Sequence, residues 1–176
     1  MNMVNIDDRT LYFAKVRDSA IIPSKDPGNA GYDIYADIDK PYFKIASHET
    51  RLVPTGIASA MSPRWYLQVE ERGSTGSKGI KKSAGVIDSS YRGEIFIAIT
   101  NVNQSDLYIT DLSPEELKET ASIDNDSEII IYPLKKAIAQ LVLHEVPDVA
   151  VREISYEELR EIPSDRGEGR LGSSGK

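Results

Sequence analysis

Short apolar or alternating stretches, separated by turn-forming residues, recur along almost the whole chain. Their spacing of roughly ten residues is typical of an all-β sandwich or jelly roll and unlike the longer strand–helix alternation of a parallel sheet. The expected strands cover residues 11–16, 32–38, 50–58, 65–70, 94–100, 128–132 and 137–146. The run 50–58 is predicted to break at a turn near Pro54.

Two helix-start signals interrupt this strand pattern. The run S-P-E-E at 113–116 has a serine N-cap, a proline at the first helical position and a capping-box glutamate. Ser155 and Glu158 form a second capping box, and Pro163 ends the helix that follows. Both helices are expected to be short.

The domain organisation follows from these elements. We expect one β domain over residues 1–163, with an insertion at about 103–128, followed by a flexible C-terminal arm over 164–176. The arm contains G-x-G-x-x-G at 167–172, but no strand precedes it and no helix can follow, so a dinucleotide-binding turn is excluded. Its arginines and backbone amides suit wrapping a phosphate group.

Composition narrows the possible functions. The chain of 176 residues is long enough for one domain with a substantial core. Its net charge of −7 argues against broad electrostatic binding to nucleic acid or to an anionic membrane. With no cysteine, there is no disulfide framework, thiolate metal site or cysteine nucleophile. We expect a cytoplasmic protein, since no apolar run approaches the roughly 18 residues of a membrane helix and no signal region is present.

The stretch 84–101, A-G-V-I-D-S-S-Y-R-G-E-I-F-I-A-I-T-N, concentrates reactive groups on one tight hairpin. Val86 and Ile87 stiffen the backbone just before Asp88, and the turn that follows carries Tyr91 and an arginine. A hairpin of this kind suits reading a small polar ligand. Taken alone, an ordinary acidic turn explains the stretch as well.

Five short motifs follow one another along the chain. They are A-G-Y-D-I-Y-A (30–36), R-G-S-T-G (72–76), A-G-V-I-D-S-S-Y-R-G-E (84–94), A-I-A-Q-L-V (137–142) and R-G-E-G-R-L-G-S-S-G (166–175). Together they resemble the motifs of the trimeric dUTP pyrophosphatases (dUTPases), and the third is highly specific. The resemblance implies a distorted jelly roll of the β-clip type with one or two short helices. It also implies a homotrimer with active sites between subunits.

The resemblance further implies an activity, the Mg²⁺-dependent hydrolysis of dUTP to dUMP and pyrophosphate. In a cell this reaction limits uracil incorporation into DNA and supplies dUMP for thymidylate synthesis. Asp88 matches the catalytic aspartate, which would orient and deprotonate the water that attacks the α-phosphorus. Asp33 matches the outer-shell partner of the metal, acting through water.

The implied substrate contacts divide by the part of the nucleotide. Backbone groups of Gly85, Val86 and Ile87 would read the uracil edge, with Tyr91 under the deoxyribose and Leu171 covering the base. The implied phosphate contacts are Arg72, Gly73, Ser74, Thr75, Gln140, Arg166, Gly169, Gly172, Ser173 and Ser174.

Three departures from the family pattern bear on these roles. Motif two reads Arg-Gly-Ser in place of Arg-Ser-Gly, so the phosphate-binding hydroxyl is either Ser74 or Thr75. Lys135-Lys136-Ala137 stand where motif four usually has Gly-Asp-Arg, which removes a structural aspartate and an arginine. Leu171 replaces the aromatic of motif five, and Arg170 could lie across the uracil ring instead.

Two other functions fit part of the pattern. One is a dCTP deaminase or a bifunctional relative, which shares the fold; the complete arm and the Gly-Val-Ile-Asp-x-x-Tyr hairpin favour the pyrophosphatase. The other is a dUTP-sensing regulator that uses the insertion as a partner surface. Asp88 argues against a purely binding role, since binding alone does not require it.

Overall fold

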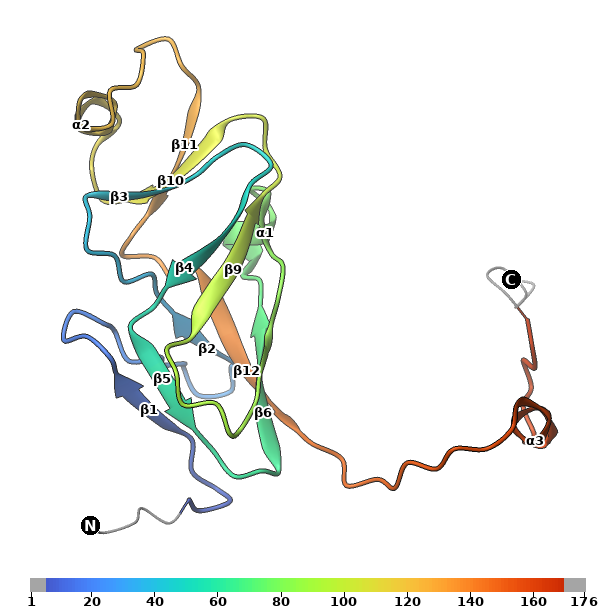
Figure 1. The fold of residues 1–176 in the computed structure, drawn as a ribbon. Coiled ribbons are helices and arrows are strands. Elements are labelled where there is room, and N and C mark those ends of the chain that lie inside the picture. Colours follow the sequence, from blue (N-terminus) through green and yellow to red (C-terminus); the bar gives the residue numbers. More distant parts are fainter. Residues whose placement is uncertain (1–5, 170–176) are drawn as a thin grey trace. The chain divides into compact units, whose positions relative to one another are not determined.

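The computed structural model describes residues 6–169, and the chain divides by packing into two compact units, Met1–Val146 and Pro147–Lys176 (Figure 1). The first unit contains all the sheets, and the second contains one short helix. The division by packing follows Val146, whereas the start of a functional arm at residue 164 stays a prediction from the sequence.

Residues 6–169 form twelve strands and three short helices. The strands are β1 (Tyr12–Lys15), β2 (Gly31–Ile34), β3 (Tyr42–Ile45), β4 (Thr50–Pro54), β5 (Ile57–Ala60), β6 (Trp65–Glu70), β7 (Ile80–Lys82), β8 (Val86–Ile87), β9 (Phe96–Asn101), β10 (Asp106–Thr110), β11 (Ile129–Pro133) and β12 (Ala139–Glu145). The helices are α1 (Gly73–Gly76), α2 (Pro114–Thr120) and α3 (Tyr156–Glu161). The predicted all-β fold with short helices is therefore confirmed.

The strands pair into four small sheets of non-consecutive order. These are β1-β5, β11-β10-β3, β2-β12-β6-β8 and β4-β9-β7. β10 and β11 run parallel, and the other pairs are antiparallel. Strands distant in sequence thus become neighbours, as β2 and β12 do in Figure 1. Long-range pairing of this kind is typical of jelly-roll architectures.

The core between these sheets is mainly aliphatic. Its fully buried side chains include Ile34, Ile45, Ile57, Leu67, Ile97, Ile99, Leu107 and Leu141. Asn101 is also fully buried, and its side-chain amide donates to the carbonyls of Ile45, Ala46 and Ser105 at 3.2, 3.2 and 2.9 Å. Because its donors are satisfied, this amide joins β9 to the end of β3 without leaving an unpaired polar group.

Four strands, β3, β7, β8 and β10, lie outside the predicted strand ranges, although Val86 and Ile87 of β8 were expected to be stiff. β10 lies inside the expected insertion 103–128, and its Leu107, Tyr108 and Ile109 are almost completely buried. The apolar run is short and follows the polar turn N-Q-S, which hides it from a search for longer strand patterns. The excursion from the sheets therefore covers 111–128 and contains α2.

The two capping boxes are confirmed at the starts of α2 and α3. The Ser113 hydroxyl accepts from the backbone N–H of Glu116 at 3.2 Å, and Ser155 accepts from Glu158 at 3.1 Å. A third helix, α1, has no Ser-x-x-Glu capping signal of this kind and is only one turn long. Across residues 6–169, no helix is long and apolar enough to span a membrane.

Candidate active site

The register of one sheet brings the first, second and fourth motifs together. Asp33 of β2 lies opposite Gln140 of β12, which lies opposite Glu70 at the end of β6. Side chains directly opposite one another in a sheet share a face, so Asp33 and Gln140 point the same way. Arg72 follows β6 by two residues and reaches back over this row to Asp33.

Arg72 and Asp33 form a two-point ion pair at the edge of the sheet. The Arg72 Nε lies 3.1 Å from Asp33 Oδ1, and its Nη2 donates to Oδ2 at 3.2 Å. A third guanidinium nitrogen donates to the carbonyl of Ala137 at 3.4 Å. The parallel N–H groups of arginine suit such paired bonds, which fix the direction of both side chains.

The short helix α1 separates the two candidate hydroxyls of motif two. Thr75 is buried, and its hydroxyl accepts from the Arg72 N–H at 3.1 Å and donates to the Arg72 carbonyl at 2.9 Å. Ser74 is exposed and faces the hollow beside Arg72 and Gly73. The threonine hydroxyl thus holds the turn together, whereas the serine hydroxyl is available to a ligand.

Gln140 is held in place by a close approach that only glycine permits. Its Nε2 donates to the Glu71 carbonyl at 3.0 Å. A Cβ at position 31 would lie 2.5 Å from Gln140 Oε1 and 2.9 Å from its Cβ. The glycine of A-G-Y-D therefore makes room for the glutamine of A-I-A-Q across the sheet.

These residues line a polar cavity of about 880 Å³ within the first unit. Its lining combines the β1–β2 loop with the residues just described: Ser24, Lys25, Asp26, Asn29, Ala30, Gly31, Asp33, Tyr35, Arg72, Gly73, Ser74 and Gln140. We call it the polar cavity below. Lys25 was not among the predicted site residues. It belongs to the loop S-K-D-P-G-N-A-G, which runs directly into motif one. Its closeness to that motif was the one sequence feature that could have indicated a role for Lys25.

The third motif forms a separate structure on the opposite edge of the same sheet. β8 pairs with β6 through only two positions, Ile87 with Leu67 and Val86 with Gln68. Gly85 accepts a hydrogen bond from Val69 N–H at 2.7 Å. Asp88 is exposed at the end of β8, and its carbonyl accepts from the N–H of Tyr91 at 3.1 Å. The predicted hairpin is not formed, because β8 pairs with β6 whereas β9 pairs with β4 and β7 in another sheet. Residues 88–93 form the turn between these two sheets, and we keep the name hairpin tip for them.

The polar cavity and the hairpin tip are far apart within one chain. Asp33 lies on β2 and Asp88 follows β8, at the two edges of the order β2-β12-β6-β8. Three strand spacings give about 14 Å, and the offset along β6 adds a similar distance at right angles, so the two carboxylates are roughly 20 Å apart. Within one chain, the two regions are therefore too far apart to contact the same phosphate group.

A buried carboxylate fixes the residue that follows the hairpin tip. Glu94 accepts from Arg17 Nη1 and Nη2 at 2.8 and 2.6 Å, and from the N–H groups of Thr55 and Gly56 at 3.1 and 2.8 Å. Arg17 also donates through Nε to Asp37 at 2.7 Å. The hydrogen bonds from Arg17 hold the pKa of Glu94 below its ordinary value, with smaller help from Gly56 and Thr55, although burial opposes this shift.

Arg17, Asp37 and Glu94 were not identified from the sequence as site residues. Arg17 and Glu94 are 77 positions apart, so only the folded chain shows that they pair. Gly56 lies between them with φ of +63°, and a Cβ there would lie 2.4 Å from Asp37 Oδ2. The one sequence feature that could have indicated this cluster was the position of Glu94 at the end of the third motif.

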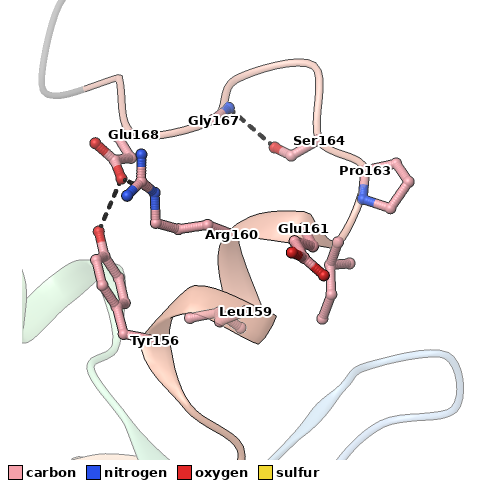
Figure 2. Close-up of a pocket in the computed structure, with 9 residues that line it drawn as sticks. Tyr156, Leu159, Arg160, Glu161, Pro163, Ser164, Gly167 and Glu168 are labelled. Carbon is pink, nitrogen blue, oxygen red and sulfur yellow. Dashed lines mark hydrogen bonds and ion pairs between the residues drawn. The ribbon is translucent and has the colours of Figure 1, made fainter.

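The second unit has its own hollow, of about 740 Å³, beside α3. Figure 2 shows Tyr156 and Arg160 both reaching Glu168, at 3.0 and 2.7 Å. Ser164 accepts from the N–H of Gly167 at 3.1 Å. The start of the fifth motif is thus folded against α3, and among the described lining residues the one cation, Arg160, is paired with Glu168.

The described residues leave part of the predicted site without a structural account. Arg166 donates through Nε to the carbonyl of Gly169 at 3.0 Å, within the second unit. The predicted contacts Leu171, Gly172, Ser173 and Ser174 lie outside the described residues, as does Arg170.

The metal-binding capacity of the cavity is limited. Among residues 6–169, no three carboxylate or imidazole side chains gather closely enough to hold an ion. Asp33 is the site's predicted metal partner, and both of its oxygens face Arg72. A single carboxylate suits a magnesium ion that takes its remaining oxygens from a triphosphate and water. The described residues therefore fit outer-shell contact with a metal better than a cage built by the protein.

The chain is similar to several known proteins of one family. The dUTPase family profile matches residues 17–112. The deoxyuridine 5′-triphosphate nucleotidohydrolase of Candida albicans is 34% identical over 148 residues, covering 84% of this chain and 76% of that protein. The Clostridium acetobutylicum protein of the same name is 31% identical over 170 residues, covering 94% and 96%.

A solved structure supports the fold independently. The dUTPase of Staphylococcus bacteriophage 80alpha with dUPNHPP superposes with a TM-score of 0.71 at 22% identity, covering 96% of this chain and 99% of that one. The matched profile spans more than half of the chain and includes the first three motifs, which contribute Asp33, Arg72 and the hairpin tip. This chain is therefore a member of the dUTPase family.

Proposed function

We propose that the protein hydrolyses dUTP to dUMP and pyrophosphate. The observation that carries the proposal is the polar cavity, where Arg72, Ser74 and Gln140 converge beside Asp33. Guanidinium, hydroxyl and amide donors around one carboxylate suit a metal–triphosphate complex. Family membership supplies the substrate class.

Asp88 is the proposed base of the reaction. It takes a proton from a water whose oxygen bonds to the α-phosphorus, while the bond to the oxygen bridging the α- and β-phosphorus breaks. Pyrophosphate leaves with the electrons of that bond. Such a base must lie within hydrogen-bond reach of the water. The exposed position of Asp88 at the end of β8 allows that approach from outside its own chain.

The remaining catalytic effect comes from positioning and charge. Arg72 and Ser74 would bind the phosphate oxygens, and Gln140 would donate from the strand beside them. Bound Mg²⁺ would neutralise charge on the triphosphate, with Asp33 contacting its water shell. We propose Ser74 as the phosphate-binding hydroxyl, because both hydrogen bonds of Thr75 go to Arg72.

Selectivity for uracil and deoxyribose is assigned to residues 85–91. Backbone groups of Gly85, Val86 and Ile87 would pair with the donor and acceptor edge of uracil, and cytosine would leave some of them unpaired. Tyr91 is 44% exposed, and its ring is available to lie against the deoxyribose and leave no room for a 2′-hydroxyl.

A complete site is proposed to need more than one chain. The roughly 20 Å between Asp33 and Asp88 within one sheet is far too long for both to act on one triphosphate. A homotrimer, the assembly that the family resemblance implies, would bring the polar cavity of one subunit to the hairpin tip of another.

The C-terminal arm is proposed to complete the phosphate site through Arg166, Gly169, Gly172, Ser173 and Ser174, with Leu171 over the base. Deleting residues 166–176 is expected to lower turnover sharply while leaving the free energy of unfolding unchanged, since these residues follow the packed β unit. Full activity after truncation would remove the arm from the site.

The test of the proposed function is pyrophosphate release from dUTP, dTTP, dCTP and UTP, each with Mg²⁺ and with EDTA. We expect release from dUTP alone, and loss of it in EDTA. Ammonia release from dCTP would favour a deaminase instead.

A further inference from the structure

The hairpin tip has few attachments to the rest of its chain. On its N-terminal side, β8 contributes a two-residue pairing to the edge of a sheet. Val86, Asp88, Ser90, Tyr91, Arg92 and Gly93 are all exposed. Arg92 bonds only locally in the described structure, donating to the carbonyls of Ser89 and Tyr91. The geometry of the tip therefore depends on what holds its other end.

That end is held by the Glu94 carboxylate. Its side chain is 12% exposed and accepts four hydrogen bonds, two from Arg17 and two from the backbone between β4 and β5. Arg17 is fixed in turn by the Asp37 carboxylate, which is 9% exposed. Three segments distant in sequence thus meet at Glu94, and none of them belongs to the polar cavity.

Tyr91 is coupled directly to this point. Its hydroxyl donates to the main-chain carbonyl of Glu94 at 2.9 Å. A Cβ at Gly93 would lie 2.5 Å from the same hydroxyl, so the phenol is packed across the tip against its own backbone. The direction of the Tyr91 ring is therefore set by where Glu94 is held.

We propose that Arg17 is a positioning residue for sugar selection, acting by clamping Glu94 and thereby fixing the ring of Tyr91. This inference rests on the proposed role of Tyr91 in reading the sugar. It assigns a role to Arg17, which lies outside all five motifs, and to Glu94, which ends the third motif without a role there. A guanidinium suits the task because it meets both oxygens of Glu94 and a second carboxylate at once. A lysine ammonium is a point charge and cannot reproduce that fork.

The experiment compares binding of α,β-imido-dUTP and α,β-imido-UTP, which differ in the 2′-hydroxyl, to the full-length wild type and to Arg17→Lys and Glu94→Gln. Isothermal titration calorimetry gives both affinities without turnover. We expect the deoxyribose preference to fall roughly tenfold in each variant, mainly through tighter binding of the ribonucleotide. The kcat/KM ratio of dUTP to UTP should fall in parallel.

Two controls separate positioning from loss of folding. Arg64→Lys alters an exposed ion pair with Glu145 elsewhere on the β unit, and it should leave the preference unchanged. A merely destabilised protein loses binding-competent molecules equally for both analogues, so its preference stays that of the wild type. Thermal unfolding of each variant identifies that case.

An unchanged deoxyribose preference in folded Arg17→Lys and Glu94→Gln would overturn the proposal. If the wild type binds the analogues with a clear preference but releases no pyrophosphate, the proposed hydrolysis is refuted. The role of Arg17 is then still decided by the binding preferences of the two variants. A wild type that binds neither analogue would overturn both.

Discussion

The polar cavity and the hairpin tip are built in contrasting ways. In the cavity, Asp33 and Gln140 lie on paired strands, and a two-point ion pair joins Asp33 to Arg72. In the hairpin tip, Asp88 and Tyr91 lie on an exposed turn with one short strand before it and one clamped residue after it. The half proposed to bind phosphate is thus preformed by sheet register, whereas the half proposed to read sugar and base depends on a few distant contacts.

We therefore expect substitutions in the two regions to affect different properties, substrate affinity in one and substrate selectivity in the other. Changes in the cavity should weaken all triphosphates alike, because the phosphates are common to them. Changes at the hairpin should alter turnover or the ranking of substrates. The following predictions test that separation.

The largest expected effect is on the hairpin, at Asp88. Asp88→Asn removes the proposed base but keeps its size, so turnover of dUTP should fall by roughly 10²–10⁴-fold while affinity for α,β-imido-dUTP stays near that of the wild type. Pyrophosphate release and calorimetry measure the two quantities. Turnover equal to the wild type would remove Asp88 from the reaction.

The next effect is in the cavity, at Gly31. Gly31→Ala places a methyl group 2.5 Å from Gln140 Oε1, which forces the glutamine away from Glu71. Misplacement of this donor should reduce kcat/KM for dUTP by roughly 10–100-fold. The deoxyribose preference should not change, and a change would contradict the separation of the two halves. Arg64→Lys, at an exposed ion pair elsewhere on the β unit, is a suitable control.

A smaller effect distinguishes the two hydroxyls of α1. Ser74→Ala should raise KM for dUTP several-fold and change the free energy of unfolding by less than about 0.5 kcal/mol. Thr75→Val should instead lower the free energy of unfolding by about 1–3 kcal/mol, because it removes two buried hydrogen bonds. Urea unfolding and initial-rate kinetics on both variants suffice. The opposite pattern would assign the phosphate-binding hydroxyl to Thr75.

The smallest effect is the acid dependence of the clamp. Glu94 has a folded-state pKa below its ordinary value of 4.5, so the unfolded chain takes up its proton first. Glu94 contributes its full stabilisation above the unfolded-state pKa, and this contribution is lost as the pH falls through the folded-state pKa. The free energy of unfolding falls by at most about 1.4 kcal/mol per pH unit in that range. Arg17 stays charged throughout and binds Asp37 through a different nitrogen from those that bind Glu94.

The measurement is the difference in free energy of unfolding between wild type and Glu94→Gln at a series of pH values. That difference should shrink as the solution becomes acidic. Glu145→Gln, in the exposed pair with Arg64, should show little dependence. A constant difference for Glu94→Gln would argue against the clamp as an acid-sensitive contact.

Much of this organisation could be predicted from the sequence because the motifs are contiguous. Local patterns indicated the strand at 65–70 and both capped helices, since these depend on neighbouring residues. The distinction between Ser74 and Thr75 could not be predicted, because it depends on which side of a single helical turn is buried. A hydroxyl next to an arginine looks the same in sequence whether it faces solvent or the core.

The remaining features require three-dimensional pairing. Nothing in the sequence indicates that β2 pairs with β12, although this register brings Asp33 to Gln140. The contact between Arg17 and Glu94 spans most of the β unit and joins residues that are unremarkable locally. Long-range ion pairs of this kind leave no periodic pattern for sequence reading to detect.

The placement of Asp88 and Arg72 toward opposite ends of the sheet has a genetic consequence. If each site takes its base from one chain and its phosphate ligands from another, a chain with Asp88→Asn still offers an intact cavity, and a chain with Arg72→Ala still offers an intact hairpin. Mixed assemblies of two inactive alleles would then contain some complete sites. Under the proposed assembly, the strand order would therefore allow two defective alleles to complement each other.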